Sequence, residues 1–186
     1  MAYEHELESE LEQLVLPELE VPRGRVQIRY METAGAEFEA EPFDPSPPPP
    51  GTILLTHFPF GRATLSGTHL GIITGIATSI AADMPGIHPL LCSFVTVEGH
   101  EDEVGDPARF GALGRARAAA VVQSLVARLR PLIARIPAAN RRDLVILVST
   151  AGPTRPIRSN VTPEGRAFNR RVEVRRNVGP CRGQIA

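Results

Sequence analysis

Beyond residue 51 the chain alternates apolar strand patterns with amphipathic helix patterns, and this order limits the possible folds more than any other feature. Three apolar runs are typical of strands in a sheet: residues 52–58, 90–98 and 143–149. The run LLCSFVTVE in the middle is strongly apolar, so we expect it at the centre of the sheet. A last strand is expected at residues 170–176, with Val172 and Val174 pointing inward.

Two helices are expected between these strands. The first follows a cap at Ser66 or Thr68 and stops at Pro85. Its buried face is predicted to consist of Leu70, Ile73, Ala77, Ile80 and Met84. The second is expected to open at Asp106 and Pro107, a cap followed by a first-turn proline, and to run to about residue 135.

A short helical turn from about residue 163 to 168 precedes the last strand. The complete order is therefore strand, helix, strand, helix, strand, strand. This alternation predicts an α/β fold in which two helices pack on one sheet.

The first 50 residues differ from the rest in composition. Residues 24–32 (RGRVQIRYM) alternate apolar and polar side chains, as a half-buried strand does; this strand would either dock on the domain or serve a partner. Residues 33–51 are acidic and rich in proline, so they cannot pack a core. We therefore expect an N-terminal arm at residues 1–50, a domain at 51–176 and a tail at 177–186.

The formal net charge of −1 hides a strong asymmetry between these parts. Residues 1–50 contain 12 acids and 3 arginines, a net charge of −9, and the remaining residues contain 9 acids and 17 arginines, a net charge of +8. An acidic arm of this kind would fold back on the basic domain or dock on a basic partner. The basic domain could attract nucleic acid, anionic lipid or an anionic cell wall, or its arginines could simply be solvated. The charge alone does not distinguish these alternatives.

Several chemistries are excluded by residues that the sequence lacks. All 20 basic residues are arginine, so Schiff-base chemistry and a P-loop lysine are excluded. The two cysteines, Cys92 and Cys181, are too few to suggest a disulfide framework or a zinc site. Ser149 and Thr150 end a strand without a nucleophile elbow or an assignable base. We expect no enzyme activity, no cofactor and no metal.

Histidines offer a weaker alternative. His57, His100 and Asp102 could approach one another as metal ligands, although a histidine that merely holds the end of a strand is the more common arrangement. His69 and His88 flank the first helix and are expected at the surface.

Arg117 is an anomaly on the second helix. It shares one line with Leu113, Val121 and Leu125 at intervals of four, which is the face that should be buried. An unpaired buried guanidinium costs several kcal/mol, so the side chain must either reach solvent or pair with a carboxylate of the protein or of a ligand. Asp102 is the obvious candidate, because it follows the 90–98 strand where open α/β sheets place ligand loops.

Two motifs resemble a known family. Gly99-His100-Glu101-Asp102 is followed by Leu113 and the run Arg115 to Ala118, and residues 164–173 read EGRAFNRRVE. In this order they resemble the OmpA C-terminal-like family, which includes Pal, MotB and many cell-wall anchors, over about residues 51–176. The resemblance implies an α+β sandwich of βαβαββ type, with two helices on one mixed sheet.

The resemblance also implies non-covalent binding of peptidoglycan through the diaminopimelate of its stem peptide. Asp102 would pair with the ligand's amino group and Arg117 with its carboxylate. An amino-acid end-group is a zwitterion, so one carboxylate and one guanidinium suit it on charge grounds as well. His100, Phe110, Gly114 and Arg170 are expected to support the site.

The sequence departs from the family pattern at this site. Phe110 lies where the family often has asparagine, Gly114 replaces a serine, and Glu101 replaces a threonine. Glu101 and the acids that follow it add negative charge beside the pocket, which could repel a carboxylate. Of Arg170 and Arg171, one is expected to lock the C-terminal turn and the other to face solvent.

The N-terminus MAYEHELESELEQL has neither the basic region nor the apolar core of a secretory signal, and no apolar run is long enough to span a membrane. We therefore expect cytoplasmic synthesis and action at the cell envelope. The glutamate-rich opening is similar to leaders of proteins encoded with extracellular contractile injection systems.

Two functional hypotheses follow. The first is a non-enzymatic wall-binding module that anchors a particle or partner through residues 1–50, without binding nucleic acid. The second is a structural subunit or cargo of a phage-tail-like particle that keeps the fold and has lost the ligand.

Overall fold

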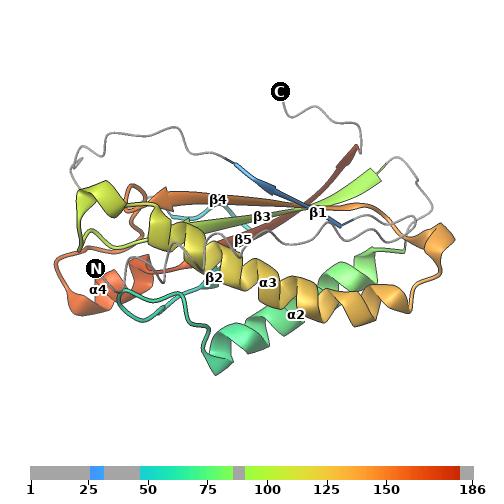
Figure 1. Ribbon diagram of the computed structural model, residues 1–186, viewed down its shortest axis with the longest axis horizontal. Helices are drawn as coiled ribbons and strands as arrows, with labels where there is room; N and C mark the ends of the chain where they lie inside the picture. Colours follow the sequence, from blue (N-terminus) through green and yellow to red (C-terminus); the bar gives the residue numbers. More distant parts are fainter. Residues whose placement is uncertain (1–25, 32–46, 86–90, 181–186) are drawn as a thin grey trace.

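A five-stranded mixed sheet forms the centre of the structure (Figure 1). The computed structural model describes residues 26–31, 47–85 and 91–180 of the 186-residue chain. The strands are β1 (Val26–Tyr30), β2 (Ile53–Leu55), β3 (Leu91–His100), β4 (Leu144–Gly152) and β5 (Val172–Pro180).

The strand order across the sheet is β1-β4-β3-β5-β2. β3 is central, as its apolar sequence predicts, and pairs in parallel with β4 and antiparallel with β5. β1 pairs in parallel with β4 from Val26 opposite Leu144 to Tyr30 opposite Val148, and β2 pairs antiparallel with β5. The strand predicted at residues 24–32 therefore docks on the sheet and forms one of its edges.

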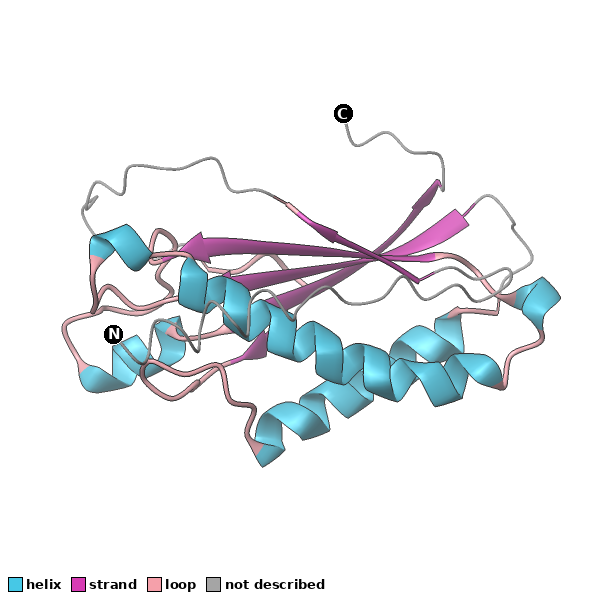
Figure 2. Cartoon of the chain, in the orientation of Figure 1, coloured by secondary structure: helices cyan, strands magenta, loops and turns pink. Residues whose placement is uncertain are grey.

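Two long helices lie on the same side of the sheet, as Figure 2 shows. α3 (Ala112–Ala134) packs against β3, β4 and β5, and α2 (Gly67–Asp83) packs against α3. The third helix, α4 (Pro163–Asn169), is the short turn expected before the last strand. The predicted α/β fold is thus confirmed, with helices packed on one mixed sheet. No helix in the described part of the chain combines the length and apolar character that a membrane span requires.

The core fills the space between the sheet and the two long helices. On α2, four of the five predicted core side chains are buried, and Leu70 is half-buried. Further core residues come from the strands and from α3: Leu55, Val95, Val97, Val121, Leu125, Leu129, Leu144, Ile146, Val172 and Val174. Val172 and Val174 of β5 point inward, as the sequence predicts.

The prediction of where the second helix begins was wrong. Asp106 does act as a cap, but its side chain accepts a hydrogen bond from the backbone N–H of Ala108 and starts only a 3-10 turn, Pro107–Arg109. Gly111, with a φ of 94°, then turns the chain into α3. Such a backbone conformation strains any residue with a Cβ, so the glycine separates the two helical segments.

β5 continues to Pro180, four residues beyond the expected end of the last strand. The reason is its antiparallel partner, because β3 pairs with β5 along its whole length, from Gly99 opposite Val172 to Leu91 opposite Pro180. Pairing with a long central strand extends the ladder past the point where the local valine alternation stops.

His69 is buried, so its expected surface position was wrong. Its backbone N–H donates to Ser66 Oγ while its Nδ1 accepts from the backbone N–H of Ser66, a reciprocal cap at the start of α2. The ring also stacks on Phe58, with centroids 4.3 Å apart. This histidine therefore fixes the start of α2 on the segment after β2. His88 lies outside the described residues.

Candidate functional site

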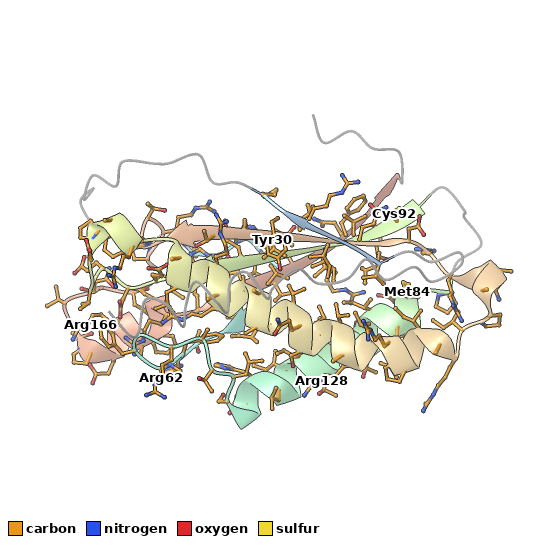
Figure 3. All side chains as sticks on the ribbon, viewed as in Figure 1. Tyr30, Arg62, Met84, Cys92, Arg128 and Arg166 are labelled. Atoms are coloured by element: carbon orange, nitrogen blue, oxygen red, sulfur yellow. The ribbon has the colours of Figure 1, made fainter. Side chains whose placement is uncertain are left out.

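The predicted site residues gather where β3 ends, at the N-terminal end of α3. Figure 3 shows Arg62 and Arg166 at this end of the molecule and Met84 and Cys92 at the other. Three segments meet here: the loop after β2, the end of β3 with the following residues, and the turn from α4 into β5. Two of the three arrive from sequence positions far from β3.

Arg117 is fully buried, and it does not reach solvent. Its guanidinium donates three hydrogen bonds, all to backbone carbonyls: to Arg62 at 3.1 Å, to His100 at 3.0 Å and to Pro59 at 3.3 Å. It also lies over the ring of Phe58, 5.6 Å from the centroid. Arg117 therefore ties α3 to the end of β3 and to the loop after β2.

No carboxylate lies within ion-pair distance of Arg117 in the part of the chain that the structure describes. Burial lowers the pKa of Arg117 to about 10, although the nearby charges of Glu101 and Asp102 act in the opposite direction. A guanidinium with this pKa stays protonated at neutral pH. The site therefore holds a buried positive charge whose direct partners are neutral carbonyl groups.

Asp102 pairs with Arg170, so the sequence-based expectation of a direct Asp102–Arg117 pair was wrong. Arg170 Nη1 donates to Asp102 Oδ2 at 2.7 Å, and Arg170 Nε donates to the carbonyl of Phe58 at 2.8 Å. The backbone N–H of Val104 donates to Asp102 Oδ1 at 3.3 Å. Both side chains of the pair are largely buried. Arg170 thus holds the carboxylate in place from the turn before β5.

Glu101 caps α3, although the sequence suggests negative charge beside the pocket. Its Oε1 accepts from the backbone N–H groups of Gly111 at 2.8 Å and Gly114 at 2.7 Å. Unpaired N–H groups at a helix start favour a carboxylate there. Burial raises the pKa of Glu101, while the two backbone donors act to lower it. Its charge is directed at the helix start.

Gly114 is a packing residue. A Cβ built on it would lie 2.5 Å from Thr150 Oγ1, and one built on Gly99 would overlap the carbonyl of Gly114. The two glycines let α3 approach β3 closely, which brings Arg117 to the end of the strand. A serine at this position would require Thr150 to shift.

Phe110 is half-buried at the end of the 3-10 turn, with its ring next to Gly105. It thus packs against the loop that follows Asp102. His57 Nδ1 lies 2.7 Å from Thr56 Oγ1, and its ring meets Phe168 edge-on. The metal-ligand group considered for His57, His100 and Asp102 is not the one that the structure brings together.

His100 lies on the other face of the sheet, away from the helices. Its Nε2 is 3.6 Å from Glu98 Oε2 and 3.5 Å from Glu173 Oε1, and all three side chains are buried. Burial lowers the pKa of His100, against the opposing effect of the two carboxylates. These three residues have the spacing of metal ligands. Arginines pair with both carboxylates, so they already provide the positive charge that a metal ion would bring to this cluster.

The arginines of this far-face cluster are Arg155, Arg171 and Arg175. Arg155 and Arg175 pair with Glu98 at 3.2 and 3.4 Å. Arg171 donates from Nη2 to Glu173 Oε1 at 2.6 Å and to the carbonyl of Arg155 at 2.9 Å. The expectation that either Arg170 or Arg171 faces solvent was wrong, because both are held by buried carboxylates. The sequence analysis did not predict this cluster. The one sequence signal that could have found it is the alternation of its residues along β3 and β5.

The structure is similar to solved bacterial domains. One is the C-terminal domain of Helicobacter pylori MotB, at 21% identity over 67% of this chain and 84% of that chain, with a TM-score of 0.49. Another is the peptidoglycan-associated lipoprotein from Burkholderia pseudomallei, at 20% identity over 66% and 88%, with a TM-score of 0.48. MotB is one of the members of the family that the two motifs resemble.

A third similar structure is the cell wall anchor of the T6SS from Pseudomonas aeruginosa. It shares 22% identity over 70% of this chain and 81% of that chain, with a TM-score of 0.44. No protein-family model matches the sequence, and no curated protein matches it.

Proposed function

We propose that this chain is a non-catalytic module that binds peptidoglycan, with Asp102 and Arg117 recognising the zwitterionic end of a stem-peptide diaminopimelate. The resemblance of the two motifs suggests the class of ligand, and the charged groups at the end of β3 suit a zwitterion. Asp102 would take the ammonium group and Arg117 the carboxylate.

The observation that carries this proposal is the state of Arg117. Its three acceptors are carbonyl oxygens, which satisfy N–H groups and leave the net positive charge in place. A buried charge without a counter-charge in direct contact is unfavourable, so an anionic group that reaches it gains a strong, charge-assisted hydrogen bond. The guanidinium has five N–H groups, two more than these bonds use.

Asp102 complements this charge. Its Oδ2 accepts from Arg170, and from the described residues its Oδ1 accepts only the long bond from the backbone of Val104. The carboxylate is held in one orientation by an arginine from another segment, as recognition of an ammonium group requires. Arg170 would act here as a positioning residue.

Cys92 supports action at the cell envelope, because it is disulfide-bonded. Disulfides persist in oxidising compartments and are rare in the cytosol. The count of two cysteines did not suggest this bond. The acidic arm, residues 1–50, would then connect the module to the particle or partner that it anchors.

A second candidate function is a structural subunit that keeps the fold without the ligand. The complete burial of Arg117 and the Arg170–Asp102 ion pair favour it, because both groups are satisfied within the chain. Phe110 and Gly114 favour it too, since neither offers the polar side chain that the family pattern has at its position.

Co-sedimentation of the purified chain with diaminopimelate-type sacculi tests the proposal. Asp102→Asn and Arg117→Gln should each weaken binding by about 10- to 100-fold, the range of a hydrogen bond to a charged group. Asp106→Asn and Arg115→Gln are matched controls, because they remove the same charges from the same loop and helix without touching the contacts of Asp102 and Arg117. Each variant is first compared with the wild type by circular dichroism.

Wild-type protein that stays in the supernatant would contradict the binding function and leave the structural subunit as the better account. Equal sedimentation of all five proteins would show that the chain binds sacculi elsewhere.

A further inference from the structure

An apolar cavity lies between the start of β1 and the C-terminal half of α3, at a distance from the site described above. Its volume is about 120 Å³, and its walls include Val26, Val126, Leu129 and Ile133. A dry, apolar cavity of about 150 Å³ is large enough to bind benzene, so this one accommodates a single aliphatic side chain.

Arginines are frequent in the segment that forms most of this cavity. Arg130 and Arg141 line it directly. From Val126 to Asp143 the chain contains five arginines and one acid, namely Arg128, Arg130, Arg135, Arg141, Arg142 and Asp143. Arg130 and Arg135 are exposed, and their guanidinium groups make no hydrogen bond or ion pair with any described residue. The surface therefore combines one apolar socket with uncompensated positive charge.

The segment that enters β1 has the complementary composition. Residues 1–25 contain seven glutamates and two arginines, and their leucines at positions 7, 11 and 14 recur at helical spacing. The segment ends at Val26, which is itself a wall of the cavity. Val21 is five residues from that wall, so an extended chain could place it up to about 17 Å away. Aliphatic side chains and acidic groups of this segment are thus within reach of the socket and of the arginines.

We propose that in the free protein residues 1–25 dock on the C-terminal half of α3, with an aliphatic side chain in the cavity and glutamates facing Arg130 and Arg135. The docked segment would cover the basic surface of its own domain. A basic partner that binds the acidic arm would have to displace it first. This docking does not depend on peptidoglycan binding.

Cleavage of the full-length chain by a glutamate-specific protease provides the test, because a docked segment is protected. The double variant Arg130→Glu/Arg135→Glu should raise the cleavage rate within residues 1–25 by about three- to tenfold in dilute buffer. High salt should raise the wild-type rate in the same direction, since exposed charges are screened within about 3 Å at 1 M ionic strength.

Two controls make the result specific. Arg109→Glu reverses one exposed arginine at the opposite end of α3 and should leave the cleavage rate unchanged. Reversing Glu8 and Glu12 to arginine removes two cleavage sites, so cleavage is followed at Glu18 and Glu20. These sites should be cleaved more slowly when the reversal is added to the double variant, because the charges then complement each other again.

Equal cleavage rates in the wild type and the double variant would overturn the proposal. Protection that grows with protein concentration would also overturn it, because the segment would then dock on a second copy. Sedimentation velocity at each concentration distinguishes these outcomes.

Discussion

Arg117 and Arg171 are both fully buried at the same end of the sheet, yet they lie on opposite faces of it and are satisfied in different ways. Arg117 faces the helices and donates to three backbone carbonyls. Arg171 lies on the far face and donates to the carboxylate of Glu173. The first keeps its net charge, and the second has its charge balanced inside the protein.

This difference separates a structural arginine from a candidate binding arginine. In a buried ion pair such as Arg171–Glu173 the charge is balanced inside the protein, although Arg171 Nη1 has no hydrogen-bond partner among the described residues. A buried guanidinium with only carbonyl partners still attracts an anion. Burial by itself would have assigned both residues the same role.

The largest effect is expected for Arg171→Met. Removing this guanidinium leaves Glu173 buried without its charge partner, so the free energy of unfolding should fall by about 3–5 kcal/mol. Urea denaturation followed by circular dichroism measures the change. A loss of less than about 1 kcal/mol would mean that the ion pair contributes little and that the comparison of the two arginines fails.

Gly99→Ala should have the next largest effect. The added Cβ would overlap the carbonyl of Gly114, which forces α3 away from β3 at a cost of about 2–3 kcal/mol. Gly75→Ala is the matched control, because a Cβ at that exposed position in α2 meets nothing and should stabilise the helix by about 0.5–1 kcal/mol. Equal effects of the two substitutions on urea denaturation would show that the close approach of α3 to β3 is not required.

Arg117→Met should destabilise the protein less than Arg171→Met, by about 1–2 kcal/mol. The substitution removes an unbalanced charge, which is favourable, but leaves three carbonyls without their donor, which is unfavourable. The same urea titration provides the number. A loss as large as that of Arg171→Met would indicate that Arg117 is mainly structural, and sacculus binding by the wild type would then need another anion site.

The smallest effect concerns His100 in the far-face cluster. Its pKa in the folded protein lies below the ordinary value of 6.5, because burial disfavours the charged ring. The unfolded chain therefore binds the proton more readily, and this contribution to stability is lost as the pH falls below about 6.5.

Between pH 7 and pH 5 the free energy of unfolding should fall more for the wild type than for His100→Gln, as measured by thermal or urea unfolding at each pH. The difference between the two proteins isolates His100 from the carboxylates, including Glu101, whose raised pKa acts in the opposite sense. Parallel pH profiles for the two proteins would contradict the assignment.

Local patterns in the sequence determined most of the elements. The apolar run of β3 predicted its central position, and Ser66 predicted the start of α2. The apolar stripe of α3 identified Arg117 as an anomaly, because a charged residue stood on the face expected to be buried. These features depend on neighbours within about one helical turn or along one strand, so the chain itself carries them. The motif at residues 99–102 likewise located the candidate site.

Only the tertiary structure decided the partners of the charged groups. Asp102 pairs with Arg170, which is 68 positions away, and Arg117 donates to a carbonyl 55 positions away. Glu101 was expected to add charge beside the pocket, but in the structure it caps α3. It reaches the helix start because the glycines at 99 and 114 let α3 approach β3 closely. Hydrogen-bond partners are chosen by distance in space, which depends on strand order and helix packing, and no local periodicity in the sequence encodes them.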